Sequence, residues 1–112
     1  MNANMYAKMR VGIVHFKAFP GIETGDGPIL ETLEKICADD FWTAVEVGWM
    51  KDFRVRNTAR QLLDQSHLTV CYATQPKVLG TKLNLNSFDE KERRTAIEAV
   101  KSCVDEAHDL GA

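Results

Sequence analysis

The sequence predicts an α/β protein made of three consecutive strand-then-helix units. Runs of apolar and β-branched residues alternate three times with segments whose apolar residues recur at helical spacing. The connections from strand to helix are long and those from helix to strand are short, which is typical of parallel strands joined by helices. Right-handed crossovers place all three helices on one face of such a sheet, so the other face is expected to need a cover.

The first unit begins with Arg10–Phe16, a nearly continuous apolar run that predicts a strand buried on both faces. The segment Lys17–Gly27 holds one proline and three glycines and predicts a loop. Pro28 suits the first position of a helix, because its missing N–H would have no partner there. The helix is expected to reach about Ala38, with an apolar face formed by Ile29, Leu33, Ile36 and Cys37.

The second unit pairs a short strand, Ala44–Gly48, with a helix that starts at Asp52. The spacing of Val55, Ala59, Leu62 and Leu63 gives this helix one apolar side. Glu46 is the one charged residue within the strand, and a carboxylate in a buried strand costs several kcal/mol unless it is compensated.

The third unit starts with the predicted strand Leu68–Tyr72, followed by a long loop over Ala73–Asn86. Ser87 and Glu90 have the spacing of a capping box and predict the start of the longest helix. Its apolar stripe is expected to contain Ile97, Val100, Val104 and Ala107.

Composition narrows the class of protein. Apolar residues make up 45% of the 112 residues and charged residues 27%, which is typical of a globular domain. No apolar run approaches the roughly 18 residues of a membrane span, and the net charge of −2 gives no reason to expect nucleic-acid binding. The three cysteines lie within apolar patterns and are interpreted as buried thiols of a cytoplasmic protein. Residues 1–8 are expected to form a disordered lead to a single domain over 9–112.

Candidate site residues lie near the carboxyl ends of the predicted strands, where α/β proteins bind ligands. Glu46 can bind a hydroxyl or assist at a metal site, but it can equally be a structural partner of a buried cation. His15 can ligate a metal or transfer a proton, although a strand histidine is more often satisfied by neighbouring polar groups. Tyr72 and Gln75 can bind a polyol, or serve as a rim aromatic and a capping amide. Trp49 can stack on a sugar, with packing slightly favoured.

Several short motifs resemble the sugar phosphate isomerase/epimerase family, whose fold is the xylose-isomerase-like TIM barrel. They are Val11–Val14, Val45–Trp49, Tyr72–Pro76, Leu83–Ser87 and Asp105–Ala112. The resemblance covers residues 9–112 and corresponds to the first three of eight βα units, so it implies an incomplete (β/α)8 barrel. It assigns a pocket-lining role to Glu46 and to Gln75, and it leaves the catalytic residues and the metal ligands outside this chain. The predicted substrate-binding residues are His15, Glu46, Tyr72 and Gln75.

In this family the resemblance further implies proton transfer through an enediol, assisted by a divalent metal such as Mn²⁺, Mg²⁺, Co²⁺ or Zn²⁺. The expected partners are a sugar or sugar phosphate, together with the remaining barrel or further copies of the chain; neither nucleic acid nor membrane is expected. The isolated chain is expected to be inactive. The competing interpretation is a non-catalytic α/β module that associates with itself through the uncovered sheet face.

Overall fold

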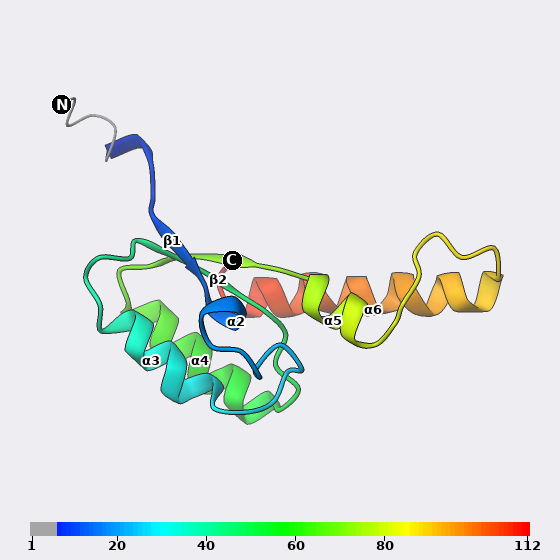
Figure 1. Ribbon diagram of the computed structural model, residues 1–112, viewed down its shortest axis with the longest axis horizontal. Helices are drawn as coiled ribbons and strands as arrows, with labels where there is room; N and C mark the ends of the chain where they lie inside the picture. The colour runs from blue at the N-terminus through cyan, green and yellow to red at the C-terminus, as the bar shows by residue number, and fades with distance from the viewer. Residues whose placement is uncertain (1–6) are drawn as a thin grey trace.

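The structure is a computed structural model that describes residues 7–112 and contains a parallel three-stranded sheet in the order β1-β2-β3. The elements are β1 (Gly12–Val14), α2 (His15–Ala18), α3 (Ile29–Cys37), β2 (Ala44–Val47), α4 (Phe53–Gln65), β3 (Thr69–Tyr72), α5 (Gln75–Gly80) and α6 (Glu90–Asp109). The α/β class and the alternation of strands and helices are therefore confirmed. Figure 1 shows α3 and α4 side by side and α6 extending away from them.

One face of the sheet is covered and the other is open. Val45 and Val47 are fully buried in the core that α3 and α4 supply, with Leu33 of α3 and Leu63 of α4 among its members. The alternate residues of the strands face the other way and are more exposed: Ala44 and Glu46 are half-buried, and Thr69 and Cys71 are exposed. A shallow hollow of about 330 Å³ lies on this face. The expectation of an uncovered face is confirmed for the part of the chain that the structure describes.

Two predicted boundaries in the strand-to-helix connections are wrong. The first strand ends at Val14, because His15 and Phe16 turn into the short helix α2 and are buried there. The expected loop Ala73–Asn86 contains another helix, α5, which has a proline in its first turn, where proline suits a helix. No residue of α5 is buried. The helix therefore has no buried apolar side that would appear as helical periodicity in the sequence.

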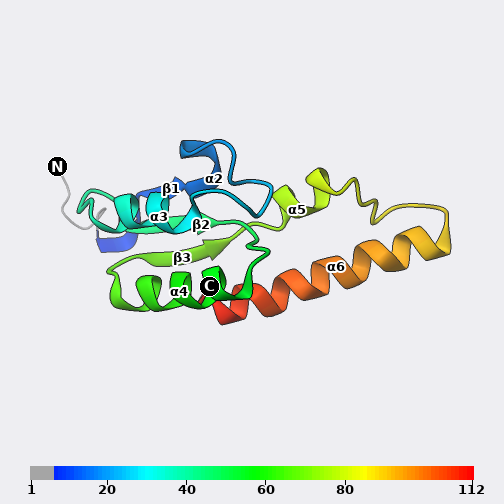
Figure 2. The same ribbon diagram turned by 90° about the horizontal axis from the view of Figure 1, so that it is seen from below.

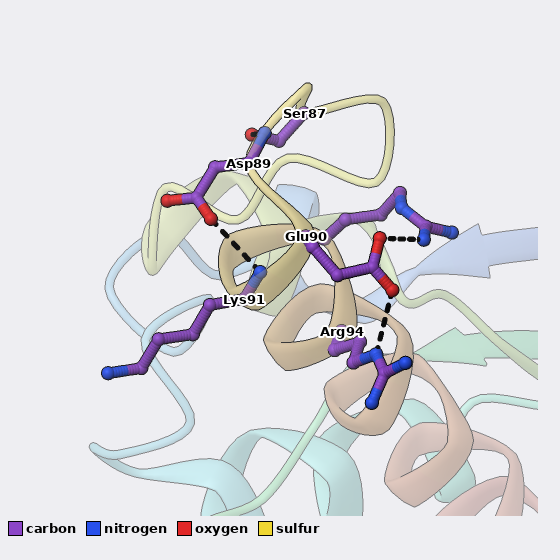
Figure 3. Close-up of polar contacts among 6 residues, drawn as sticks. Ser87, Asp89, Glu90, Lys91 and Arg94 are labelled. Carbon is purple, nitrogen blue, oxygen red and sulfur yellow. Dashed lines mark hydrogen bonds and ion pairs between the residues drawn. The ribbon is translucent and has the colours of Figure 1, made fainter.

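The last helix starts two residues later than the capping box predicted. Asp89 is the N-cap, and its side chain accepts a hydrogen bond from the N–H of Lys91 at 3.0 Å (Figure 3). Ser87 lies two residues before Asp89, and its Oγ accepts a hydrogen bond from the N–H of Asp89 at 3.1 Å. Glu90 turns to Arg93 and Arg94 instead of Ser87. Aspartate is as effective an N-cap residue as serine, so Asp89 caps the helix in place of the predicted Ser87–Glu90 capping box.

The buried stripe of α6 also differs from the predicted one. Ala96, Cys103 and Leu110 are fully buried, whereas Val104 is 61% exposed. The buried residues repeat every seven positions and lie beside the predicted stripe of Ile97, Val100, Val104 and Ala107. Figure 2 shows the carboxyl-terminal part of α6 beside α4, with the first part of α6 projecting beyond the sheet.

Three further expectations concern cysteines, the start of the chain and membranes. Cys103 is buried, Cys37 is half-buried and Cys71 is exposed on the open face, so the buried-thiol interpretation is wrong for Cys71. The predicted lead of residues 1–8 falls mostly outside the described residues. Its last two residues, Ala7 and Lys8, are described, and they are helical and exposed. Within residues 7–112 no helix combines the length and apolar character that crossing a bilayer requires.

Candidate functional site

A pocket of about 510 Å³ lies at the carboxyl edge of the sheet. All three strand-to-helix connections contribute to it, and its volume falls within the range of small-molecule sites. Its lining residues are Phe16, Lys17, Glu23, Thr24, Trp49, Lys51, Gln75, Pro76, Leu79, Gly80 and Thr81. The long loops therefore meet at the edge where the sequence predicted them to gather ligand-binding groups.

Trp49 is held firmly in the wall of this pocket. Its indole Nε1 donates a hydrogen bond to the carbonyl of Glu23 at 2.9 Å. Gly25 packs so closely that an added Cβ would lie 3.1 Å from Cδ2 and Cε2, the two atoms shared by the rings. Such an approach is possible only across a face of the indole. Gly25 also has a φ of +83°, so glycine meets both requirements at this position.

Cationic groups gather around this indole. The Nζ atoms of Lys51 and Lys77 lie 5.3 and 5.4 Å from the ring centroid, within the range of cation–π attraction. Lys51 also pairs with Asp26 at 2.7 Å, and Lys77 donates to the Oγ of Ser102 at 3.0 Å. The Trp49 wall therefore carries positive charge beside its apolar surface.

Glu23 is the one carboxylate in the pocket lining. Its Oε2 accepts a hydrogen bond from the N–H of Gly21 at 2.6 Å. Backbone N–H donors, with a smaller contribution from Lys17, hold the pKa of Glu23 below its ordinary value. The pocket thus offers one stable anionic acceptor together with the ammonium groups of Lys17 and Lys51.

A buried polar cluster fixes the loop that carries Trp49 and Lys51. Between these two residues lies Met50, whose N–H donates to Oε1 of Glu106 at 2.6 Å. Nη2 of Arg56 donates to the carbonyl of Met50 at 3.0 Å and lies 3.3 Å from Oε2 of Glu106. We call Met50, Arg56 and Glu106 the Met50 clamp. The sequence analysis missed it, and only the spacing of Glu106 beside Cys103 and Leu110 hinted that this acid faces the core.

Glu106 is 4% exposed, and burial raises the pKa of its carboxyl group. The Met50 N–H and the Arg56 and Lys77 charges oppose that rise. The Tyr72 hydroxyl is buried without a hydrogen-bond partner among residues 7–112. Burial, and then the charge of Glu106, raises the pKa of Tyr72. Tyr72 therefore faces this interior cluster on the covered side of the sheet.

The structure buries His15 away from the pocket. The side chain is 1% exposed, and Nε2 lies 2.7 Å from Oγ1 of Thr32. Because the Thr32 hydroxyl donates to the carbonyl of Pro28 at 2.8 Å, we assign Nε2–H of His15 as the donor to Thr32. Burial lowers the pKa of His15 to about 4, so the imidazole is neutral near pH 7.

The four predicted site residues are not brought together. Gln75 lines the pocket, as the sequence predicted for a rim residue. Glu46 lies on the open face, in register with Val14 and Cys71, and forms no ion pair with any residue from 7 to 112. Trp49, for which packing was favoured, is both packed and part of the pocket wall.

Comparisons with protein-family models, curated proteins and solved structures find no match to this chain. Within the described part of the chain, no group of three or more His, Cys, Asp or Glu side chains lies close enough to hold a metal ion. What the site offers chemically is a small-molecule pocket with an aromatic wall, hydroxyl and amide groups, and mixed charge.

Proposed function

We propose that this chain is the amino-terminal part of a cytoplasmic sugar or sugar-phosphate isomerase or epimerase of the TIM-barrel type. The observation that carries the proposal is the pocket formed by three successive strand-to-helix connections at the carboxyl edge of a parallel sheet. TIM-barrel enzymes place their active sites at this edge. The parallel order β1-β2-β3, with α3 and α4 on one face of the sheet, supports an assignment to consecutive barrel units.

The open face of the sheet supports the same proposal. In a closed barrel the face away from the helices lies inside, where inward-pointing side chains fill the interior. Val14, Glu46 and Cys71 share one register position across the three strands. Glu46 would then lie inside the barrel near its carboxyl end, where a carboxylate can accept a hydrogen bond from a substrate hydroxyl.

The groups that line the pocket suit a polyol. Gln75 offers both donors and acceptors, and Thr24, Thr81 and Glu23 add further partners for hydroxyl groups. Trp49 and Phe16 provide apolar surface for the carbon skeleton of the sugar. In this proposal the present chain binds and orients the sugar.

The proposed reaction is proton transfer through an enediol. In this type of enzyme a divalent metal polarises the substrate oxygens. The described residues do not fit such a metal, since no cluster of His, Cys, Asp or Glu forms a ligand set among them. Metal ligands and proton-transfer groups would therefore come from outside this chain, and we derive no step through the metal.

Sugar binding by the 112-residue chain tests this proposal. Trp42 and Trp49 are the two tryptophans, so Trp42→Phe leaves Trp49 as the reporter of the pocket. We expect D-fructose or D-fructose 6-phosphate to change the Trp49 emission saturably. Gln75→Ala should weaken binding by roughly tenfold, the effect of losing one to two hydrogen bonds. The control Gln61→Ala, an exposed position on α4, should leave binding unchanged. No saturable response to either sugar would contradict the proposal.

A second candidate function is self-association through the open sheet face, with no catalysis. The hollow lined by Gly12, Val14, Ala44 and Cys71 favours it, because an uncovered parallel sheet exposes apolar surface. We expect light scattering to give a discrete dimer or larger assembly in this case. Ala44→Lys, which places a charge on that face, should return the chain to a monomer. A wild-type chain that is monomeric and well folded would exclude this function.

A further inference from the structure

We propose that Glu106 is a positioning residue for the pocket at the carboxyl edge of the sheet. Through the Met50 clamp it fixes the positions of Trp49 and Lys51, and it couples the docking of α6 to the pocket. This inference deepens the proposed function, since it concerns the same pocket. Glu106 itself is absent from the pocket lining, so it acts through Met50 and Arg56.

Both backbone polar groups of Met50 are held by a single side-chain pair, Glu106 and Arg56. Glu106 accepts a hydrogen bond from the N–H of Met50, and Arg56 donates one to the carbonyl of Met50. Nη2 of Arg56 and Oε2 of Glu106 lie 3.3 Å apart. The result is a closed ring of three polar contacts around Met50. Its geometry fixes both the position and the orientation of the backbone at that residue.

The backbone at Met50 supports the pocket wall. Trp49 and Lys51 flank Met50 directly, and both line the pocket. The Met50 side chain is 2% exposed and belongs to the core, so it anchors the loop from below. A displacement at Met50 would therefore move the indole and the ammonium group on either side of it.

The Met50 clamp joins α4 and α6, which are distant in the sequence. Glu106 is in the part of α6 that docks beside α4, while Arg56 is in the first turns of α4 (Figure 2). Fully buried Cys103 and Leu110 hold α6 on either side of Glu106. Movement of α6 would withdraw the acceptor from Met50 and leave a buried N–H without a partner, which is unfavourable. The position of α6 is thereby transmitted to Trp49.

The test compares three variants in the Trp42→Phe background. Glu106→Ala removes the acceptor, and Glu106→Gln keeps an acceptor oxygen but loses the charge. Glu98→Ala is the matched control, because it removes an exposed carboxylate from the same helix, far from the Met50 clamp in sequence. Amide hydrogen exchange of Met50 and the emission of Trp49 report on the clamp without any ligand. D-fructose 6-phosphate titration reports on the pocket.

We expect Glu106→Ala to speed exchange at the Met50 amide by roughly tenfold beyond its effect on other β2–α4 amides, and to shift the Trp49 emission. Glu106→Gln should retain most of that protection, while the Met50 amide proton moves upfield. Glu98→Ala should leave the Met50 exchange and the Trp49 emission unchanged. If Glu106→Ala does not fold, the Met50 shift in Glu106→Gln decides.

Two outcomes would overturn the inference. Unchanged Met50 exchange and Trp49 emission in a folded Glu106→Ala, or an unshifted Met50 amide in Glu106→Gln, would show that the clamp does not position the loop. An equal response of Met50 to Glu98→Ala would show that the response does not arise from the clamp. Failure of the wild-type chain to bind either sugar would reject the proposed function and leave the exchange and emission results to judge the clamp.

Discussion

Acidification from about pH 7 to pH 4 is expected to destabilise this fold by about 3 kcal/mol through His15 alone. The pKa of His15 is lowered from 6.5 to about 4 by burial, and each pKa unit corresponds to about 1.4 kcal/mol. Because the folded pKa lies below the unfolded value, His15 contributes its full stability above pH 6.5. That contribution is lost as the pH falls toward 4, since the unfolded chain takes up the proton first.

Urea unfolding of the wild-type chain and of His15→Gln at several pH values measures this effect. The difference between their free energies of unfolding isolates His15 from the carboxylates, whose titration is common to both proteins. His108→Gln is the control for the replacement of a histidine at an exposed position. If His15→Gln loses as much stability as the wild type between pH 6.5 and 4, His15 is not buried as the neutral imidazole.

The sequence predicted the α/β class correctly because that class follows from short-range patterns. The strands around Val45 and Val70 are apolar runs of strand length, and the helix starting at Asp52 has both an N-cap residue and one apolar side. Alternation of such segments leaves few topologies open. The elements that were missed, α2 and α5, are helices of 4 and 6 residues, too short to show a helical period.

The candidate site was harder to predict, because it depends on which acid the tertiary structure buries. Glu46 is in a strand and was therefore predicted to be a buried acid. Strand alternation instead places it on the open face, while Val45 and Val47 point to the covered face. Glu106 is in a helix rich in charges, where only its spacing from Cys103 and Leu110 separates it from its exposed neighbours. Its burial depends on contact with Met50, 56 residues earlier in the chain. Only the packing of α6 decides this.

The same reasoning applies to the two apolar stripes of α6. Ile97, Val100, Val104 and Ala107 form a regular stripe, but so do Ala96, Cys103 and Leu110 on the adjacent side. Helical periodicity identifies both sides as apolar and does not rank them. The structure chooses the second stripe, because that side carries Glu106 toward Met50 and Arg56.

Leu110→Ala is expected to destabilise the protein by about 3 kcal/mol, whereas Val104→Ala should cost less than about 0.5 kcal/mol. Leu110 is fully buried at the end of α6 and would leave a cavity in the core, while Val104 is 61% exposed on the same helix. The free energy of unfolding in urea, measured for both variants under the same conditions, tests this pair directly. The reverse ranking would mean that α6 docks through the stripe the sequence favoured. The Met50 clamp could not then form, since Glu106 would turn away from Arg56.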